Sequence, residues 1–154
     1  MVDVARLQEY SLFGGLLPDD IDRIKPFLCG ASYDAGEAIL KEGEPNGRLH
    51  FVIEGRVEVT KRDKRIVELG EGDAFGEVEL LDVLPAVATI RSLTPTKIVY
   101  LSNHNLHDIY KTDPRIFAML IMNLARELAR RLRWMDELAC AARNEGGGND
   151  QDGS

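Results

Sequence analysis

Apolar and polar residues alternate with a period of two from about residue 30 to residue 102. This alternation is typical of strands with one buried face, and the apolar run at 98–101 is typical of a more deeply buried strand. Glycines at 36, 43, 47, 55, 70, 72 and 76 separate the runs. Turn-forming residues recur at 44–47 and 62–64. About eight short strands are therefore expected, arranged as a jelly roll or small barrel.

Helical patterns flank this region on both sides. Residues 3–11 predict a short helix, and Pro18 followed by two aspartates predicts the start of a second one. Residues 104–110 predict another short helix, and Pro114 lies at the start of a long one. Residues 145–154 contain no apolar side chain, so we expect this tail to be disordered.

The predicted fold is mainly β with flanking helices: an eight-stranded jelly-roll β-barrel with N-terminal helices and a long C-terminal helix. We divide the chain into N-terminal helices (1–30), a barrel (31–102), C-terminal helices including a dimer helix (103–144) and a tail (145–154). The length of 154 residues is that of one domain.

The long helix has two apolar stripes. Phe117, Leu120 and Leu124 form one, which we expect to pack back on the barrel. The other follows the 4-3 spacing of a heptad seam, through Ile121, Ala125, Leu128, Leu132, Met135, Ala139 and Ala142. The alternative is a single wide stripe that rests entirely on the barrel. We favour homodimerisation through Leu128, Leu132 and Met135, because the seam continues beyond the reach of a small barrel.

Composition limits the partners and the compartment. The formal net charge of −7 argues against bulk attraction to nucleic acid or to an anionic membrane. No stretch approaches the roughly 18 consecutive apolar residues of a membrane span, and Met1 does not begin a signal peptide. Cys29 and Cys140 are far apart and show no paired spacing, which indicates reduced thiols in a cytoplasmic protein.

The segment 72–90 contains the most specific motif. Phe75-Gly76-Glu77 follows a glycine-rich turn, and Pro85 and Ala88-Thr89 come later at a set spacing. A glycine turn that leads into a short helix directs backbone N–H groups at an anion. This frame resembles the phosphate-binding cassette of the cyclic nucleotide-binding domain family, which includes catabolite activators and protein kinase A regulatory subunits. The turns at Gly36, Gly43, Gly55 and Gly70 match as well, so that the resemblance covers about residues 10 to 140.

The resemblance implies a ligand of the cyclic AMP or cyclic GMP class and no metal or other cofactor. In such a site Glu77 would accept the ribose 2′-hydroxyl proton. The family's phosphate-binding arginine falls on Ala86, which offers at most a backbone N–H. Glu79 replaces a small residue, and Val87 replaces a small residue that is often a hydroxyl donor. Loss of one partner of a buried charge pair costs about 2–5 kcal/mol, so a weakened site is expected. The implied ligand-binding residues are Phe75, Gly76, Glu77, Val78, Ala86, Val87 and Thr89.

Two functions from different classes fit these observations. The first is a stand-alone regulatory module that senses a small ligand and signals through its C-terminal helix to a protein partner. The second is a degenerate domain that binds no nucleotide and acts as a dimeric interaction or scaffold protein. A cupin-type metal enzyme is a third and more distant reading, because the strand region contains a single histidine, His50. We predict that the chain is not an enzyme, and that it does not bind DNA by itself.

Three further features bear on the candidate chemistry. The arginines at 126, 130, 131, 133 and 143 make the long helix basic, either as a solvated face or because one of them reaches the pocket and replaces the missing charge. Trp134 either packs as an anchor or caps a purine by stacking. His104 and His107 share a helix face, but no third metal ligand lies near them in the sequence.

Overall fold

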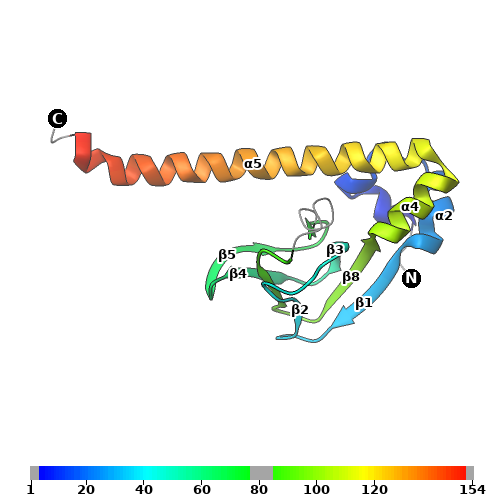
Figure 1. The fold of residues 1–154 in the computed structure, drawn as a ribbon, viewed down its shortest axis with the longest axis horizontal. Coiled ribbons are helices and arrows are strands. Elements are labelled where there is room, and N and C mark those ends of the chain that lie inside the picture. Colours follow the sequence, from blue (N-terminus) through cyan, green and yellow to red (C-terminus); the bar gives the residue numbers. More distant parts are fainter. Residues whose placement is uncertain (1–3, 77–84, 152–154) are drawn as a thin grey trace.

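The computed structural model describes residues 4–76 and 85–151, without the side chains at 4, 135, 138 and 142–151. Figure 1 shows two layers of strands below a long helix, with the short helices gathered at the end where that helix begins. The strands are β1 (Cys29–Tyr33), β2 (Ala38–Leu40), β3 (Arg48–Glu54), β4 (Val57–Lys61), β5 (Lys64–Leu69), β6 (Ala74–Phe75), β7 (Thr89–Ser92) and β8 (Thr96–Ser102).

The strands form two antiparallel four-stranded sheets. Their orders are β1-β8-β3-β6 and β2-β7-β4-β5, so that neighbours in each sheet come from distant parts of the chain. In the first sheet Phe51 pairs with Val99 of β8 on one side and with Ala74 of β6 on the other. In the second, Val59 of β4 pairs with Val67 of β5 and with Ile90 of β7. The expected mainly β fold with flanking helices is confirmed.

Two apolar clusters form the core. Val52, Val57, Phe75, Ile90 and Ile98 are buried in the cluster between the sheets. The larger cluster joins the outer face of the first sheet to the helices, and Leu49, Phe51 and Leu101 contribute to it from the strands. Strand β3 is buried on both faces, which explains why its apolar pattern extends beyond strict alternation.

The helical elements surround one end of the first sheet. They are α1 (Val4–Gln8), the 3₁₀ turn η1 (Ser11–Phe13), α2 (Pro18–Ile24), the 3₁₀ turn η2 (Lys25–Phe27), α4 (Asn103–Thr112) and α5 (Pro114–Gln151). Ser102 caps α4, since its hydroxyl accepts the N–H of Asn105 at 3.1 Å. In the part of the chain that the structure covers, no helix is both long and apolar enough to cross a membrane.

The first half of α5 is fixed to the N-terminal segment. Arg115 donates to the buried carboxylate of Asp20 at 2.5 Å. The buried amide of Asn123 donates to the carbonyls of Leu12 and Gly14, both at 2.9 Å. Leu120 and Leu124 are buried beside these contacts. The apolar stripe that was expected to face the barrel therefore packs into a core that the N-terminal segment and α4 share with the first sheet.

The C-terminal part of α5 extends past both sheets (Figure 1). The helix has 38 residues, which corresponds to a length of about 57 Å. It continues to Gln151, through residues 145–151 where the composition favours disorder. Residues 146–148 are glycines, and each glycine costs about 1 kcal/mol relative to alanine in a helix.

His50 is the one histidine of the barrel strands, and it is buried. Its ring stacks on that of Phe75 with 4.8 Å between ring centroids and a 2° angle between planes. Within the described residues, His50 Nδ1 has no hydrogen-bond partner. Burial, together with the positive charge of Arg48, lowers the pKa of His50 to about 4. The imidazole is therefore neutral in the native protein at neutral pH.

We predict that His50 makes the fold sensitive to acid. Its pKa is lower in the native than in the unfolded state, so its contribution is complete above pH 6.5 and is lost as the pH falls toward 4. Between pH 7 and pH 5 the wild type should lose about 2 kcal/mol of unfolding free energy that His50→Gln retains. Urea denaturation at the two pH values measures this difference.

Titration of the His50 imidazole by NMR gives its native pKa directly, even if the Gln variant is too unstable to study. A native pKa near 6.5 would contradict the prediction.

We also predict that residues 145–154 contribute nothing to global stability. Their composition offers no apolar group whose burial would offset the entropy of ordering them. A chain that ends at Asn144 should melt within about 1 °C of the full chain by calorimetry, since an effect of 1 kcal/mol would shift the midpoint by about 2–8 °C. A clear drop in the melting temperature would show that the tail packs against the domain.

Candidate ligand-binding site

The turn after β6 requires glycine. Gly76 has φ of +85°, in the left-handed region that residues with a side chain rarely adopt. A Cβ atom at this position would lie 2.6 Å from the Arg48 carbonyl oxygen and 2.9 Å from Asn46 Nδ2. The chain thus turns sharply against the start of β3, immediately before the rest of the cassette.

The residue before this turn is part of the core. Phe75 is buried, pairs with His50 across β6 and β3, and stacks on its ring. Its side chain belongs to the apolar cluster between the sheets. Phe75 therefore fixes the first arm of the cassette, since it holds Gly76 at the edge of the first sheet.

The second arm of the cassette is held by the loop before β3. Pro85 forms an isolated bridge with Pro45. The Ala86 N–H donates to the Glu44 carbonyl at 2.8 Å, and the Gly43 N–H donates to the Ala86 carbonyl at 2.8 Å. Residues 43–48 thus contact both arms of the cassette, because the carbonyl of Arg48 lies under Gly76.

These contacts bear on the expected role of Ala86. The sequence left Ala86 at most its backbone N–H for a ligand; in the structure that N–H is bonded to Glu44, and Ala86 is only 3% exposed. The hydroxyl of Thr89 accepts the Glu42 N–H at 3.0 Å, so it also stabilises the loop. Val87 is exposed. Glu77, Val78 and Glu79 lie outside the described residues.

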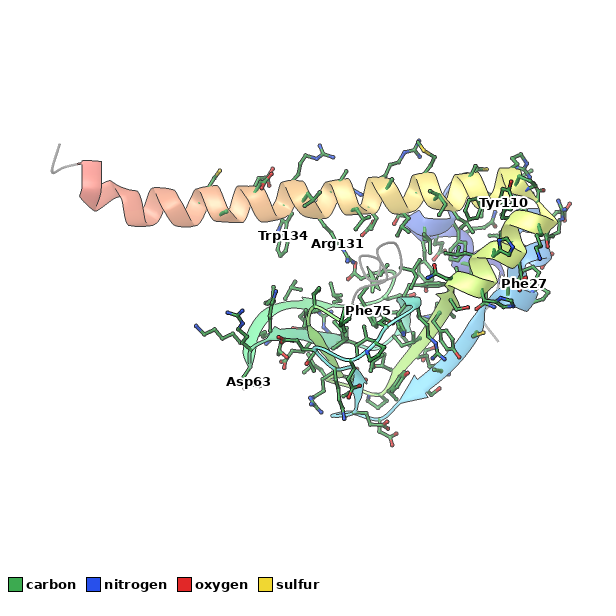
Figure 2. The ribbon with its side chains drawn as sticks, in the orientation of Figure 1. Phe27, Asp63, Phe75, Tyr110, Arg131 and Trp134 are labelled. Atoms are coloured by element: carbon green, nitrogen blue, oxygen red, sulfur yellow. The ribbon has the colours of Figure 1, made fainter. Side chains whose placement is uncertain are left out.

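Helix α5 approaches the cassette from above. Figure 2 shows Arg131 and Trp134 directed from α5 toward the barrel, with Arg131 above the region of Phe75. An Arg131 guanidinium N–H donates to the carbonyl of Ala74, the residue that precedes Phe75. Glu127 lies 3.8 Å from Arg131 Nε, one turn earlier on the helix. The side chain of Arg131 is 28% exposed, and Trp134 is 45% exposed.

The sequence did not single out Arg131 among the arginines of the helix. The others that the structure describes make different contacts: Arg126 donates to Asn123 at 3.4 Å and Arg130 to Glu127 at 2.8 Å, while Arg133 is exposed. The spacing of the buried Leu120 and Leu124 carries some of this information, because Arg131 lies one heptad after Leu124 and therefore on the same helix face.

Two surface hollows are lined by described residues. A groove of about 640 Å³ runs between η1 and α5, and its walls include Gly14, Gly15, Met119 and Met122. A smaller hollow of about 190 Å³ lies beside the loop before β3, next to Asn46, Arg48 and His50. Among the described side chains, no three of histidine, cysteine, aspartate and glutamate gather as metal ligands would.

Comparison with known proteins agrees with this geometry. The family model of the cyclic nucleotide-binding domain matches residues 31–113. A CRP-like cAMP-activated global transcriptional regulator of Mycobacterium tuberculosis is 27% identical over 129 residues, which cover 80% of this chain and 58% of that protein. The chain therefore spans little more than half the length of this relative.

Solved structures show the same fold. The catabolite activator protein of Thermus thermophilus superposes with a TM-score of 0.74 at 28% identity, over 86% of this chain and 63% of that one. The regulatory subunit of a cAMP-independent protein kinase A from Trypanosoma brucei superposes with a TM-score of 0.68 at 25% identity, over 80% and 43% of the two chains. The fold, the glycine turn of the cassette and the matched residues agree: this chain belongs to the cyclic nucleotide-binding domain family.

Proposed function

We propose that this chain is a regulatory module that senses a ligand of the cyclic nucleotide class and transmits the signal through α5. The observation that carries the proposal is the turn at Gly76. Its left-handed backbone and close approach to Arg48 place a glycine turn at the edge of a sheet, where the family binds a cyclic phosphate. The match to the family model supports the same ligand class.

The names of the relatives give opposite indications about whether the ligand is cyclic AMP. The relative from M. tuberculosis is described as cAMP-activated, and the kinase of the subunit from T. brucei as cAMP-independent. This chain has alanine in place of the phosphate-binding arginine, and the Ala86 N–H is already bonded to Glu44. We therefore propose weak binding of cyclic AMP and cyclic GMP through Gly76, Glu77, Val78, Val87 and Thr89.

Helix α5 is suited to carry the signal. Its first half is fixed to the N-terminal segment through Asn123, and Arg131 then contacts β6 two residues before Gly76. A ligand that shifts this end of β6 would act directly on the middle of the helix. The relatives are described as a transcriptional regulator and a kinase regulatory subunit, which supports a regulatory rather than a catalytic role. With a net charge of −7, we propose that the signal passes to a protein partner and not directly to DNA, in the cytoplasm.

The second candidate is a dimeric interaction protein that binds no nucleotide. The observation that favours it is again Ala86, which is buried and leaves the second arm of the cassette without a cation. Both candidates use α5 as the interface with a second copy. Leu132 is 64% exposed in the single chain, whereas Leu128 is half-buried. The side chain of Met135 lies outside the described residues.

We predict that restoring the cassette strengthens binding. Ala86→Arg adds the bidentate phosphate contact, and Glu79→Ala removes a carboxylate whose charge repels the ligand. The double variant should bind cyclic AMP at least about tenfold more tightly than the wild type, a difference of about 1.4 kcal/mol. Isothermal titration calorimetry with cyclic AMP and cyclic GMP measures both chains.

Each single change should help less, because an arginine placed near Glu79 can pair with that carboxylate. Melting temperatures of all variants control for the cost of a larger side chain at the buried position 86. If neither the wild type nor the stable double variant binds any cyclic nucleotide, the sensor proposal fails and the interaction protein remains.

We also predict a parallel homodimer through the second half of α5. Leu128→Glu with Leu132→Glu places like charges across the seam and should give a folded monomer by light scattering. The matched control is Arg130→Gln with Arg133→Gln, which changes the net charge equally on the opposite face and should leave the dimer intact. A wild type that is monomeric at high concentration would refute the dimer.

A further inference from the structure

A cyclic phosphate that leaves water for a protein site needs a compensating positive charge. The described part of the cassette provides none: Phe75, Gly76 and residues 85–89 are uncharged. The N–H of Ala86 is already bonded to the Glu44 carbonyl, and the hydroxyl of Thr89, which accepts the Glu42 N–H, is neutral. A cation for this site has to come from another element of the fold.

Helix α5 brings one arginine to the cassette. The Arg131 guanidinium donates to the Ala74 carbonyl, and Gly76 follows only two residues later. Two residues span at most about 7 Å, so the guanidinium lies within a side chain's length of the glycine turn. Figure 2 shows the side chain of Arg131 directed from the helix toward the barrel above Phe75.

The side chain of Arg131 is also well placed electrostatically. It is more shielded from water than that of Arg130, with exposed fractions of 28% and 54%. A charge in a less solvated position interacts more strongly with a nearby anion. Glu127 faces Arg131 from the previous turn, at 3.8 Å, and it also pairs with Arg130 at 2.8 Å. The carboxylate of Glu127 is thus shared between the two arginines.

We propose that Arg131 of α5 binds the phosphate of the ligand, in place of the arginine that the cassette lacks. The inference rests on the proposed function and names the residue that gives the site its affinity for an anion. A guanidinium has five N–H donors in a planar fork, so it can bind a phosphate and keep a bond to the Ala74 carbonyl. The ligand then connects the cassette directly to the helix.

This arrangement makes the signal depend on the charge of the ligand. A neutral ligand in the cassette would not attract the charge of Arg131. An anionic ligand would attract the guanidinium, and α5 with it, toward Gly76. The part of α5 that would move first is its middle, between the anchor at Asn123 and the exposed seam at Leu132.

The test compares charge variants at position 131 in the Glu79→Ala chain, which removes the competing carboxylate. Arg131→Gln should weaken the binding of cyclic AMP at least about tenfold, while Arg131→Lys should recover part of the loss because it keeps the charge. Arg130→Gln, on the neighbouring exposed side chain, is the matched control and should change the affinity less than about twofold. Calorimetry and NMR chemical shifts measure the dissociation constants.

Two readouts separate a charge contact from a merely structural role. Adenosine has no phosphate, so its binding should be unaffected by Arg131→Gln. In the chain that also has Ala86→Arg, a second cation is present, and Arg131→Gln should cost less than about threefold. A loss that is equal for adenosine and cyclic AMP, or equal with and without Ala86→Arg, would overturn the proposal.

The remaining outcomes distinguish the inference from the function on which it rests. If the chains with Ala86 bind cyclic AMP and Arg131→Gln has no effect, the inference is wrong and the sensor function stands. If only chains with Ala86→Arg bind, Arg131 does not supply the charge, and the inference is also wrong. If no chain binds, the proposed function fails and the inference fails with it.

Discussion

The position of α5 depends on the buried amide of Asn123. This side chain donates to the carbonyls of Leu12 and Gly14 at 2.9 Å each, and a buried donor left without these partners would cost about 1–3 kcal/mol. The two bonds fix both the rotation and the axial position of the helix. About 12 Å further along, the same rotation brings Arg131 to the carbonyl of Ala74. The contact between helix and cassette therefore depends on a polar anchor about two turns earlier on the same helix.

The cassette depends in turn on the loop before β3. Residues 43–48, the loop and the first residue of β3, bond to Ala86 on one side and lie against Gly76 on the other, so that one continuous segment positions both arms. His50 and Phe75 complete this support with stacked rings below the turn. The described backbone on both sides of the cassette is thus held by the rest of the domain, and these described residues carry no positive charge. A single basic side chain at the right place is then enough to change its affinity considerably.

Much of the fold follows from local patterns in the sequence. The alternation at 49–59 and 88–90, the glycines between strands and Pro114 at the start of α5 were sufficient to predict a barrel with flanking helices, because each reflects the backbone or the solvent exposure of its own segment. The family frame around Gly76 was found for the same reason, because a left-handed turn strongly favours glycine. The dimer seam and the ligand-binding residues remain predictions.

Other features were not accessible from local patterns. The use of the Ala86 N–H by Glu44, and the burial of His50 without a described partner for Nδ1, are long-range contacts. Arg131 could not be separated from its neighbours, because small errors in the assumed helical rotation accumulate along a helix. The contacts of Asn123 remove this uncertainty, and a sequence pattern does not reveal which carbonyls a buried amide will meet.

The central claim is that the ligand binds between the cassette and α5. Trp134 is the only tryptophan of the chain and lies one turn after Arg131, directed toward the barrel in Figure 2. Titration of its fluorescence with cyclic AMP in the Glu79→Ala chain is therefore the most direct test. The account predicts a saturable change in emission with the same midpoint as the calorimetric heat. Calorimetric binding that leaves the emission of Trp134 unchanged would place the ligand elsewhere and contradict the account.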